Sequence, residues 1–352
     1  MRRGFVRKQG GSKPGRLNET ADKKLMKDAL LSEEAWVLMP NEASRSCPAP
    51  AVSVVIPLFN YAAYIKGCLD SVRASKTEGM PGGFEVVVVD DASTDASIKV
   101  VEEYLATSPL PICLVKKKVN TGVSDTRNIG MLIARAPLVF MLDADNEIRP
   151  GCLLAHYHAL AASNHAVAYG IINRFDNATR QSMGTMSHAE WNVRNLVSYS
   201  YIDTMAMLRK EPVLHVGGYS IEYGLVLTQG WEDYDLWLKL AQAGYSGIFI
   251  PEVLSDYRVK PDSLICRAVL NQRAASAYLS RKFFALAQPH GDTPTLFGFS
   301  RRELALAYGQ GTGMPSPAAR PPAMRLIHRL LGNKLRRSLN KRLMSLYLWL
   351  NK

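Results

Sequence analysis

The sequence predicts an α/β protein built on a mostly parallel sheet flanked by helices. Between residues 52 and 142, apolar runs of strand length alternate with segments of helical periodicity, which is the pattern of consecutive βαβ units. The apolar runs are nearly continuous, as in strands that are buried on both faces. Acidic residues directly follow two of these runs, and the carboxyl ends of the strands form the ligand-binding edge of an open α/β sheet.

The first half of the chain is expected to alternate strictly between strands and helices. We predict strands at 52–57, 84–89, 112–115 and 138–142, and helices at 64–75, 93–107 and 122–136. Pro57 ends the first strand and Pro137 follows the last helix, because proline lacks the N–H group that either element would need. Ser93 or Thr94 is placed to cap the second helix. Right-handed crossovers should connect the parallel strands.

The second half mixes strands and helices less regularly. We predict strands at 167–173, 204–208, 247–250 and 253–259, and helices at 151–163, 232–243 and 262–287. Pro251 is expected to end the strand that begins at Gly247. In the helix 232–243, apolar residues recur on one face, which predicts that this helix packs against the core.

The two ends of the chain differ from its middle in composition. We divide the chain into an N-terminal arm with a linker (1–50), a globular domain (51–265), a helical extension (266–308), and a hinge with a basic tail (309–352). The arm is expected to be mobile, with one helix around 21–38. The net charge is +12, and its surplus lies at the two ends, because residues 1–18 and 305–352 contain basic residues and no acidic ones.

The tail has the pattern of an amphipathic helix, since leucines recur at helical spacing among its basic residues. Such a helix is typical of a segment that lies on an anionic membrane surface. Packing on its own domain or in a homodimer is the alternative, and nucleic-acid binding is not expected. No apolar run reaches eighteen residues, so we expect no membrane span. Five scattered cysteines without a C-x-x-C pair favour reduced thiols. We therefore expect a cytoplasmic protein, peripheral at the inner face of the cytoplasmic membrane.

Three common nucleotide or metal sites are excluded by the sequence. The first strand-to-helix turn, 58–61, contains no glycine, so the G-x-G-x-x-G fingerprint is absent. No G-x-x-x-x-G-K-[ST] phosphate loop occurs either. The loop that starts at Asp143 has Ile148 where a calcium-binding EF-hand requires glycine.

Three acidic pairs lie at the ends of predicted elements: Asp90 with Asp91, Asp143 with Asp145, and Glu232 with Asp233. Alternation along an extended segment points both carboxylates of the second pair to one side. This arrangement suits a divalent cation that keeps positions open for phosphate oxygens. Each pair also has a structural explanation, as helix caps, as a solvated turn, or as partners of a helix dipole. Their joint occurrence favours a functional site.

Five motifs occur in a fixed order along the chain. They are VIPLFNY at 55–61, VVVDDASTD at 87–95, NTG at 120–122 with RN at 127–128, LDAD at 142–145, and WEDYDLW at 231–237. This series resembles glycosyltransferase family 2 over residues 51–265. The resemblance implies the GT-A fold and transfer of a sugar, with inversion of configuration, from a nucleotide-sugar donor.

The resemblance also implies a role for each matching residue. The donor-binding positions that it implies are Pro57, Phe59, Asn60, Asp90, Asp91, Arg127 and Asp143. Arg127 falls where the family often has a basic residue near the diphosphate, and a salt bridge on a helix surface is the alternative. Asp145 matches the metal ligand, supported by Asp143, for Mg²⁺ or Mn²⁺. Asp233 matches the catalytic base.

Elementary chemistry agrees with these roles. Sugar transfer develops negative charge on the departing diphosphate, which a divalent ion can neutralise as a Lewis acid. It also removes a proton from the acceptor hydroxyl, which Asp233 can accept if its pKa is raised. Apolar neighbours and the like charge of Glu232 would raise it. Trp231 and Glu232 are expected on the acceptor side, where Trp231 either stacks on a sugar or packs in the core.

Lys260 departs from the pattern of the family. It stands where many relatives place a histidine that completes the metal site, and a protonated lysine cannot ligate a metal. It can instead contact a donor phosphate as a point charge, which would lower the dependence on metal. We therefore count Lys260 among the donor-binding residues.

The sequence therefore predicts an inverting, metal-dependent glycosyltransferase that uses a UDP-sugar in the synthesis of cell-surface polysaccharide. The expected acceptor is a hydroxyl of a glycan or of a lipid-linked glycan. One alternative is a non-catalytic protein of the same fold, which Lys260 suggests. Another is a nucleotidyltransferase, because such enzymes also use paired aspartates with Mg²⁺.

Overall fold

The computed structural model of this protein describes residues 36–47, 49–221, 230–260 and 272–300. The strands of its large sheet are β1 (Trp36–Pro40), β2 (Val52–Leu58), β3 (Phe84–Asp90), β4 (Ile112–Lys117), β5 (Leu138–Met141), β6 (Glu147–Ile148), β7 (Val167–Asp176), β8 (Ser182–Met186), β9 (Ala206–Arg209) and β10 (Gly247–Val259). They follow the order β1-β4-β3-β2-β5-β9-β7-β10-β6, with β8 paired to β7. Strands β4, β3, β2 and β5 are parallel to one another, so the predicted α/β class is confirmed.

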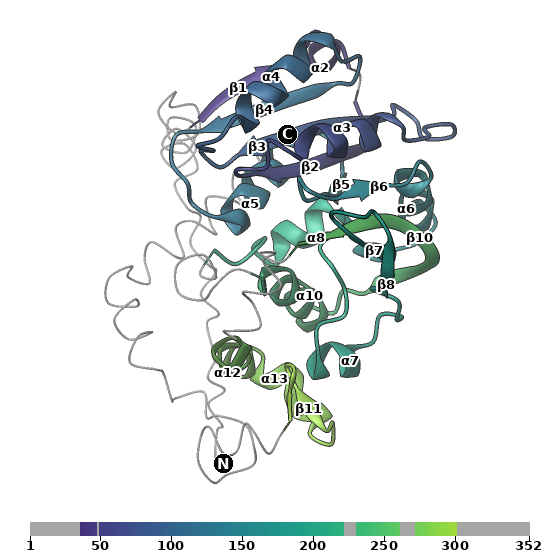
Figure 1. The fold of residues 1–352 in the computed structure, drawn as a ribbon. Helices are drawn as coiled ribbons and strands as arrows, with labels where there is room; N and C mark the ends of the chain where they lie inside the picture. Colours follow the sequence, from purple (N-terminus) through teal and green to yellow (C-terminus); the bar gives the residue numbers. More distant parts are fainter. Residues whose placement is uncertain (1–35, 48, 222–229, 261–271, 301–352) are drawn as a thin grey trace, which may run out of the picture.

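The helices cover both faces of this sheet (Figure 1). They are α2 (Glu42–Ser46), α3 (Ile65–Arg73), α4 (Ser97–Thr107), α5 (Val123–Ile133), α6 (Cys152–Ala161), α7 (Val193–Ser198), α8 (Lys210–His215), α10 (Glu232–Gln242), α12 (Gln272–Lys282) and α13 (Phe284–Ala287). Alternate residues of β2 and β3 enter two separate apolar clusters, because successive side chains of a strand point to opposite faces. Helices α3, α4 and α6 contribute to one cluster, and α5, α8 and α10 contribute to the other.

Helix α5 lies unusually close to the sheet. A Cβ atom at Gly130 would lie 2.3 Å from Cγ1 of Val55 in β2, so only glycine fits at this point of the helix. Glycine inside a helix costs roughly 1 kcal/mol relative to alanine. The close approach sets the distance between α5 and the strands, and α5 carries Arg127.

Strand β9 interrupts the parallel arrangement. It pairs antiparallel with β5 on one side and with β7 on the other, and β7 then runs parallel to β10. Thus β9 joins two parallel groups of strands into one sheet. Its pairing with β5 brings the segment before β9 next to the residues that follow β5.

Three predictions about secondary structure were wrong. Helix α4 begins at Ser97 after Ala96, so neither Ser93 nor Thr94 caps it. Residues 36–38, expected at the end of a helix, lie in β1, which pairs antiparallel with β4. Pro251 does not end its strand, because β10 continues from Gly247 to Val259 with register shifts between Ile250 and Ser255. An irregularity of this kind accommodates a residue that cannot donate to the ladder.

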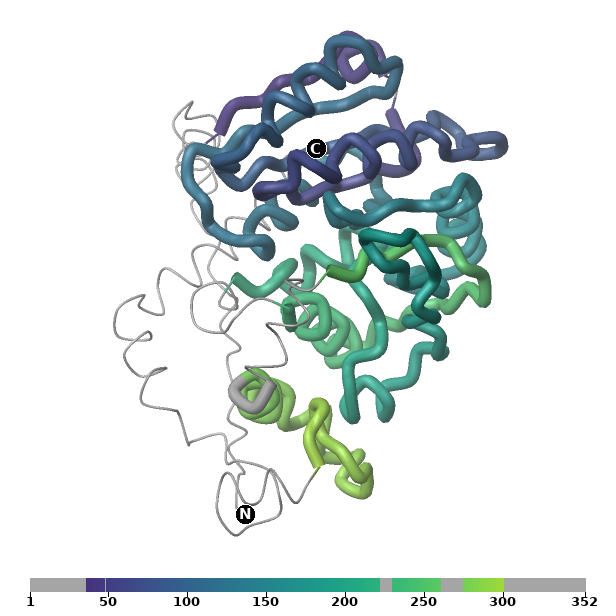
Figure 2. Tube along the Cα trace, in the orientation of Figure 1, coloured from purple at the N-terminus to yellow at the C-terminus, as the bar shows by residue number. Residues whose placement is uncertain are grey.

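The part of the chain after β10 packs near α7 and α10. In Figure 2, α12 is followed by α13 and by the hairpin of β11 (Thr295–Leu296) and β12 (Phe299–Ser300), and this hairpin lies beside α7. Phe297 N–H donates to the carbonyl of Val197 over 2.8 Å, and the buried Asp235 of α10 forms an ion pair with Lys282 of α12. The extension is therefore attached to the domain through both α7 and α10.

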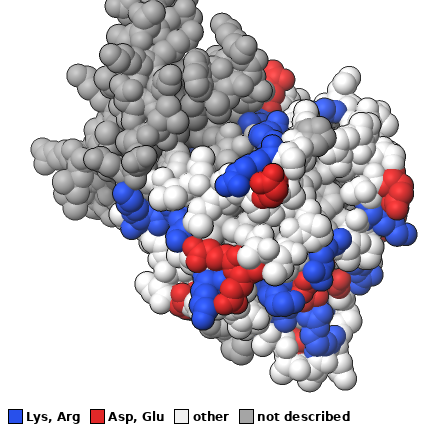
Figure 3. All heavy atoms as spheres, turned by 90° about the horizontal axis from the view of Figure 1, so that it is seen from above, with Lys and Arg blue, Asp and Glu red and all other residues white. Residues whose placement is uncertain are grey.

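The predictions for the arm before residue 36 and for the hinge and tail from residue 309 onward concern residues outside the described ranges. In the described ranges, no helix is long and apolar enough to cross a membrane. On the face shown in Figure 3, acidic and basic side chains lie next to one another.

Candidate active site

The loop after β2 forms the first wall of the site. Pro57 lies buried within β2, and Phe59, directly after the end of this strand, is 42% exposed. Asn60 has a φ of 57°, a left-handed conformation in which asparagine is enriched. Its side chain accepts a hydrogen bond of 2.8 Å from the N–H of Thr94. The loops after β2 and β3 are thus held together, as expected for residues at the carboxyl ends of neighbouring strands.

Asp90 ends β3 and is fully buried. One of its oxygens accepts a hydrogen bond of 3.0 Å from the N–H of Ser93, and the other has no partner within the described part of the chain. Burial raises the pKa of this carboxyl, although the hydrogen bonds with Ser93 act in the opposite direction. Asp90 therefore keeps one acceptor oxygen that none of the described residues uses.

Asp91 holds the start of α5. Its carboxylate accepts hydrogen bonds of 2.9 Å from the backbone N–H groups of Thr121 and Gly122, and it forms a 2.6 Å ion pair with the buried Lys117. Both oxygens are thus engaged within the protein, so the expected contact between Asp91 and the nucleoside stays a prediction. Lys117 was missed by the sequence analysis, and its only signal was a basic residue at the end of a short strand.

Arg127 connects two of the predicted motifs. It donates one hydrogen bond of 2.8 Å to Asp143, beyond β5, and another of 2.8 Å to Glu232 at the start of α10. The side chains of Arg127 and Glu232 are each only 4% exposed, which excludes the alternative of a surface salt bridge. Two facing carboxylates raise the pKa of the guanidinium against the effect of its burial. Three residues far apart in the sequence therefore form one buried ionic bridge.

Asn128 and Tyr219 fix the position of Arg127 through two hydrogen bonds between them and one ring contact. Asn128 Nδ2 donates to the carbonyl of Tyr219 over 2.9 Å, and its Oδ1 accepts the N–H of Tyr219 over 2.8 Å. The Tyr219 ring then lies with its centroid 5.4 Å from the guanidinium carbon of Arg127, within the range of a cation–π contact. Neither residue had been assigned a role from the sequence.

Asp145 is paired with Lys260. The ammonium lies 2.6 Å from Oδ2 of Asp145, and the two side chains are 9% and 13% exposed for Lys260 and Asp145. Burial and the neighbouring Asp143 raise the pKa of Asp145, while Lys260 lowers it. The lysine at the position of the expected histidine is thus part of the same site as the Asp-x-Asp motif.

Asp233 lies in the first turn of α10, next to Glu232. Burial raises the pKa of its carboxyl well above 3.8, and the like charges of Glu232 and Asp203 raise it further. A raised pKa is what a carboxylate base needs in order to accept a proton near neutral pH. The environment that the sequence predicted for Asp233 is therefore present.

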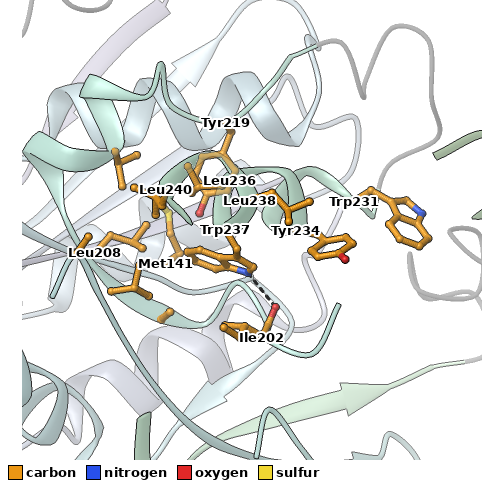
Figure 4. Close-up of a cluster of buried hydrophobic side chains, with 14 of the residues drawn as sticks. Met141, Ile202, Leu208, Tyr219, Trp231, Tyr234, Leu236, Trp237, Leu238 and Leu240 are labelled. Atoms are coloured by element: carbon orange, nitrogen blue, oxygen red, sulfur yellow. Dashed lines mark hydrogen bonds between the residues drawn. The ribbon is translucent and has the colours of Figure 1, made fainter. Parts of the chain in front are cut away.

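Asp203 is a further member of this group that the sequence analysis missed. Burial and the charge of Asp143 raise its pKa to about 7. The carbonyl of the preceding residue, Ile202, accepts a 3.0 Å hydrogen bond from the indole of Trp237 (Figure 4). Because β9 runs antiparallel to β5, this segment continues toward Asp143. Only the sheet topology reveals this, since the motifs give no signal for Asp203.

Trp231 and Glu232 have clear roles within the protein. Trp231 is 8% exposed and lies at the end of the core cluster beyond Tyr234 (Figure 4), with 6.0 Å between the ring centroids. The second oxygen of Glu232 accepts the N–H groups of Gly230 and Trp231 over 2.7 and 3.0 Å. These contacts shape the turn that leads into α10. The expected contacts of Trp231 and Glu232 with an acceptor stay predictions.

Both carboxylates of the Asp-x-Asp motif are paired with basic side chains of the protein. Asp143 is paired with Arg127, and Asp145 with Lys260. Among the described residues, no group of three His, Cys, Asp or Glu side chains is arranged to hold a metal ion. An ion at Oδ2 of Asp145 would have to displace the ammonium of Lys260, so these side chains as arranged do not fit Mg²⁺ or Mn²⁺. The expected metal therefore stays a prediction that the arrangement does not favour.

Two models of known protein families match the part of the chain that forms this site. A model described as glycosyl transferase family 2 matches residues 53–217, and one described as glycosyl transferase family group 2 matches residues 138–308. The chain belongs to glycosyltransferase family 2. The two matched segments together include every residue of the site described above.

Curated relatives of this family 2 chain include much longer proteins. Hyaluronan synthase of Pasteurella multocida is 29% identical over 143 residues, which are 39% of this chain and 14% of that protein. Chondroitin synthase of Escherichia coli is 24% identical over 247 residues, which are 66% of this chain and 33% of that protein. The chain thus spans a third or less of the length of these two relatives.

A solved structure confirms the fold of the family 2 domain. Residues 1–349 of S. aureus TarS, in complex with UDP-GlcNAc, superpose with a TM-score of 0.52 at 16% identity. The match covers 85% of this chain and 91% of that one. The predicted GT-A fold is therefore confirmed.

Proposed function

We propose that this protein is an inverting glycosyltransferase that moves a sugar from a nucleotide-diphosphate donor to a hydroxyl of a glycan or lipid-linked acceptor. The observation that carries the proposal is the buried bridge of Arg127 with Asp143 and Glu232. It brings the motif expected at the donor and the motif expected at the acceptor into one site. The assignment to family 2 favours glycosyl transfer over the nucleotidyl transfer that paired aspartates also allow.

The donor is proposed to lie along the carboxyl ends of β2, β3 and β5. Pro57, Phe59 and Asn60 would contact the nucleoside, and the unpartnered oxygen of Asp90 is an acceptor that a base or ribose could use. Arg127 and Lys260 supply positive charge beside the Asp-x-Asp motif, where the diphosphate would depart. UDP is the proposed nucleotide, supported by the similarity to TarS, whose structure was solved with UDP-GlcNAc.

Asp233 is proposed as the general base. Its carboxylate would take the proton from the acceptor hydroxyl while that oxygen attacks the anomeric carbon. A single base opposite the leaving group suffices for direct displacement, and direct displacement inverts configuration. The raised pKa of Asp233 supports this role, because a base whose pKa lies near the working pH transfers protons efficiently.

Release of free UDP is the test of this function. We expect a UDP-sugar to raise the melting temperature of the protein, because a ligand at a hundred times its dissociation constant stabilises the folded state by about 2.7 kcal/mol. With an acceptor present, the same sugar nucleotide should yield free UDP. Binding without UDP release would favour the non-catalytic alternative, and pyrophosphate release would favour a nucleotidyltransferase. Failure of a full panel of nucleotide sugars to stabilise the protein would refute the donor site.

We further propose that the protein works at the cytoplasmic face of the membrane, on glycans of the cell surface. The names of the relatives, hyaluronan synthase and chondroitin synthase, support a polysaccharide acceptor. The basic, leucine-rich tail in the sequence supports contact with anionic lipid.

The tail can be tested by sedimentation with lipid vesicles. When anionic vesicles are pelleted by centrifugation, a chain that ends at Pro322 should stay in the supernatant, whereas the full chain should sediment with the vesicles. Neutral vesicles and high salt are the controls, because electrostatic attachment requires anionic lipid and is screened by salt. Equal sedimentation of both chains would remove the membrane proposal and leave packing on the domain or in a homodimer.

A further inference from the structure

The ammonium of Lys260 occupies a confined position at the Asp-x-Asp motif. It lies 2.6 Å from Oδ2 of Asp145, and it faces the rings of Tyr61 and Tyr64 with 4.2 and 4.7 Å to their centroids. Aromatic faces attract a cation, more strongly when it is desolvated. One carboxylate and two ring faces thus hold a cation that is 9% exposed.

The strand that leads to Lys260 is itself fixed to the Asp145 loop. The backbone N–H of Arg258, at the end of β10, donates to Oδ1 of Asn146 over 2.9 Å. Arg258 Nε donates to the carbonyl of Asp145 over 2.8 Å, and its guanidinium pairs with Glu147 at 2.7 Å. These three contacts join the end of β10, which precedes Lys260, to the segment 145–147, which contains Asp145. Lys260 is therefore placed by the fold, unlike a lysine on a free surface.

The two aspartates of the motif now each have a cation of the chain. Arg127 pairs with Asp143 as well as with Glu232, and Lys260 pairs with Asp145. A divalent ion that approached Asp145 would meet the fixed positive charge of Lys260, and like charges repel strongly where water is excluded. The ammonium of Lys260 has three N–H donors, so it can contact a departing diphosphate while it remains beside Asp145.

We propose that the ammonium of Lys260 takes the place of a divalent metal ion, binding the diphosphate of the donor and stabilising it as it leaves. This inference rests on the proposed glycosyl transfer. In that reaction the bond between the anomeric carbon and the β-phosphate oxygen breaks, and its electron pair stays on the diphosphate. The acceptor oxygen bonds to the anomeric carbon, and its proton goes to Asp233. Lys260 forms no bond, and its flexible stem lets the ammonium contact phosphate as a point charge.

The proposal predicts UDP binding that is independent of metal. Titration calorimetry with UDP should give the same dissociation constant in EDTA and in Mn²⁺ for the natural chain. Lys260→Met should weaken UDP binding in EDTA about tenfold or more, because a charge-assisted contact is lost. Lys260→Arg, which keeps the charge, should retain most of the affinity. Lys99→Met is the matched control, because Lys99 is 77% exposed on α4 and the substitution removes the same charge.

A second variant distinguishes the effect of the Lys260 charge from the effect of a bound metal ion. Lys260→His removes the fixed ammonium and adds a ligand that prefers transition metals. Its UDP binding should become dependent on Mn²⁺, and electron paramagnetic resonance should detect bound Mn²⁺ in this variant but not in the natural chain. These readouts do not require turnover.

The outcomes distinguish this inference from the proposed function. UDP binding by the natural chain only in the presence of Mn²⁺ would overturn the role of Lys260 and leave glycosyl transfer intact. Equal UDP affinity for the natural chain and Lys260→Met in EDTA would do the same. Absence of UDP binding under every condition would overturn the UDP donor site and, with it, this inference.

Discussion

Replacement of Asp233 by asparagine is expected to slow sugar transfer by about 10²–10⁴-fold, the usual contribution of a general base. The amide has nearly the same size but cannot accept the proton of the acceptor hydroxyl. Donor binding should change little, because Asp233 is proposed to face the acceptor. The rate is measured as acceptor-dependent UDP release, and UDP affinity by calorimetry. Loss of UDP affinity together with the rate would contradict the assignment of the base.

The pH profile gives a second check on Asp233. The pKa of its carboxyl is raised well above 3.8 in the folded state, so the base is protonated and inactive at low pH. The rate of transfer should therefore rise with pH through a midpoint well above 3.8. Asp203→Asn removes one of the like charges that raise this pKa, so the midpoint should move to lower pH.

The stability of the Asp233→Asn variant should change in the opposite sense from its activity. A carboxyl with a raised folded pKa favours the folded state in its protonated form, and this stability is lost as pH rises from the unfolded to the folded pKa. Asparagine is neutral at every pH and avoids this loss. At pH 8 the variant should thus have a higher melting temperature than the natural chain, as expected where a functional site is destabilising.

Removal of Arg127 is expected to have the largest effect on stability. In Arg127→Met, the carboxylate of Glu232 would lose its guanidinium partner while its side chain stays only 4% exposed. Breaking a buried ion pair from one side typically costs about 3–5 kcal/mol. Urea unfolding should show this loss, and transfer should disappear because Asp143 and the start of α10 are no longer held together.

Arg194→Met is the matched control for Arg127. Arg194 forms two hydrogen bonds with Asp292, but its side chain is 49% exposed and that of Asp292 is 66% exposed. A surface pair of this kind contributes about 0–1 kcal/mol. Similar losses for the two variants would show that the Arg127 bridge does not stabilise the fold as a buried pair should.

The regular half of the fold could be predicted because each of its elements carries a local signal. A strand that is covered on both faces is mostly apolar, as β3 is from Val86 to Val89, and such a run is visible without a structure. Strand β1 could not be predicted this way. Its partner β4 lies far along the chain, and Val37 and Leu38 are exposed at the sheet edge, so no local pattern distinguishes them from a helix.

For the site, too, some features could be predicted from local sequence motifs and others could not. Motif order predicted that Arg127, Asp143 and Glu232 belong to one site, and in the structure Arg127 contacts both carboxylates. Their roles toward donor and acceptor stay predictions. The partners of each charge depend on distances between elements, which the sequence does not contain. Asp203 illustrates this, because its position follows from the antiparallel pairing of β9 with β5. A strand of four residues has no local feature that specifies its direction.

The attachment of α12 to α10 sets a limit on how this protein can be shortened. Asp235 lies fully buried in α10, two residues after Asp233, and forms ion pairs with Lys282 and with Lys239. Removal of the chain beyond residue 265 would take away Lys282 and leave the buried carboxylate of Asp235 with one cation fewer, in the helix that bears the proposed base. A catalytic fragment intended for crystallisation or directed evolution should therefore retain the residues through Ser300.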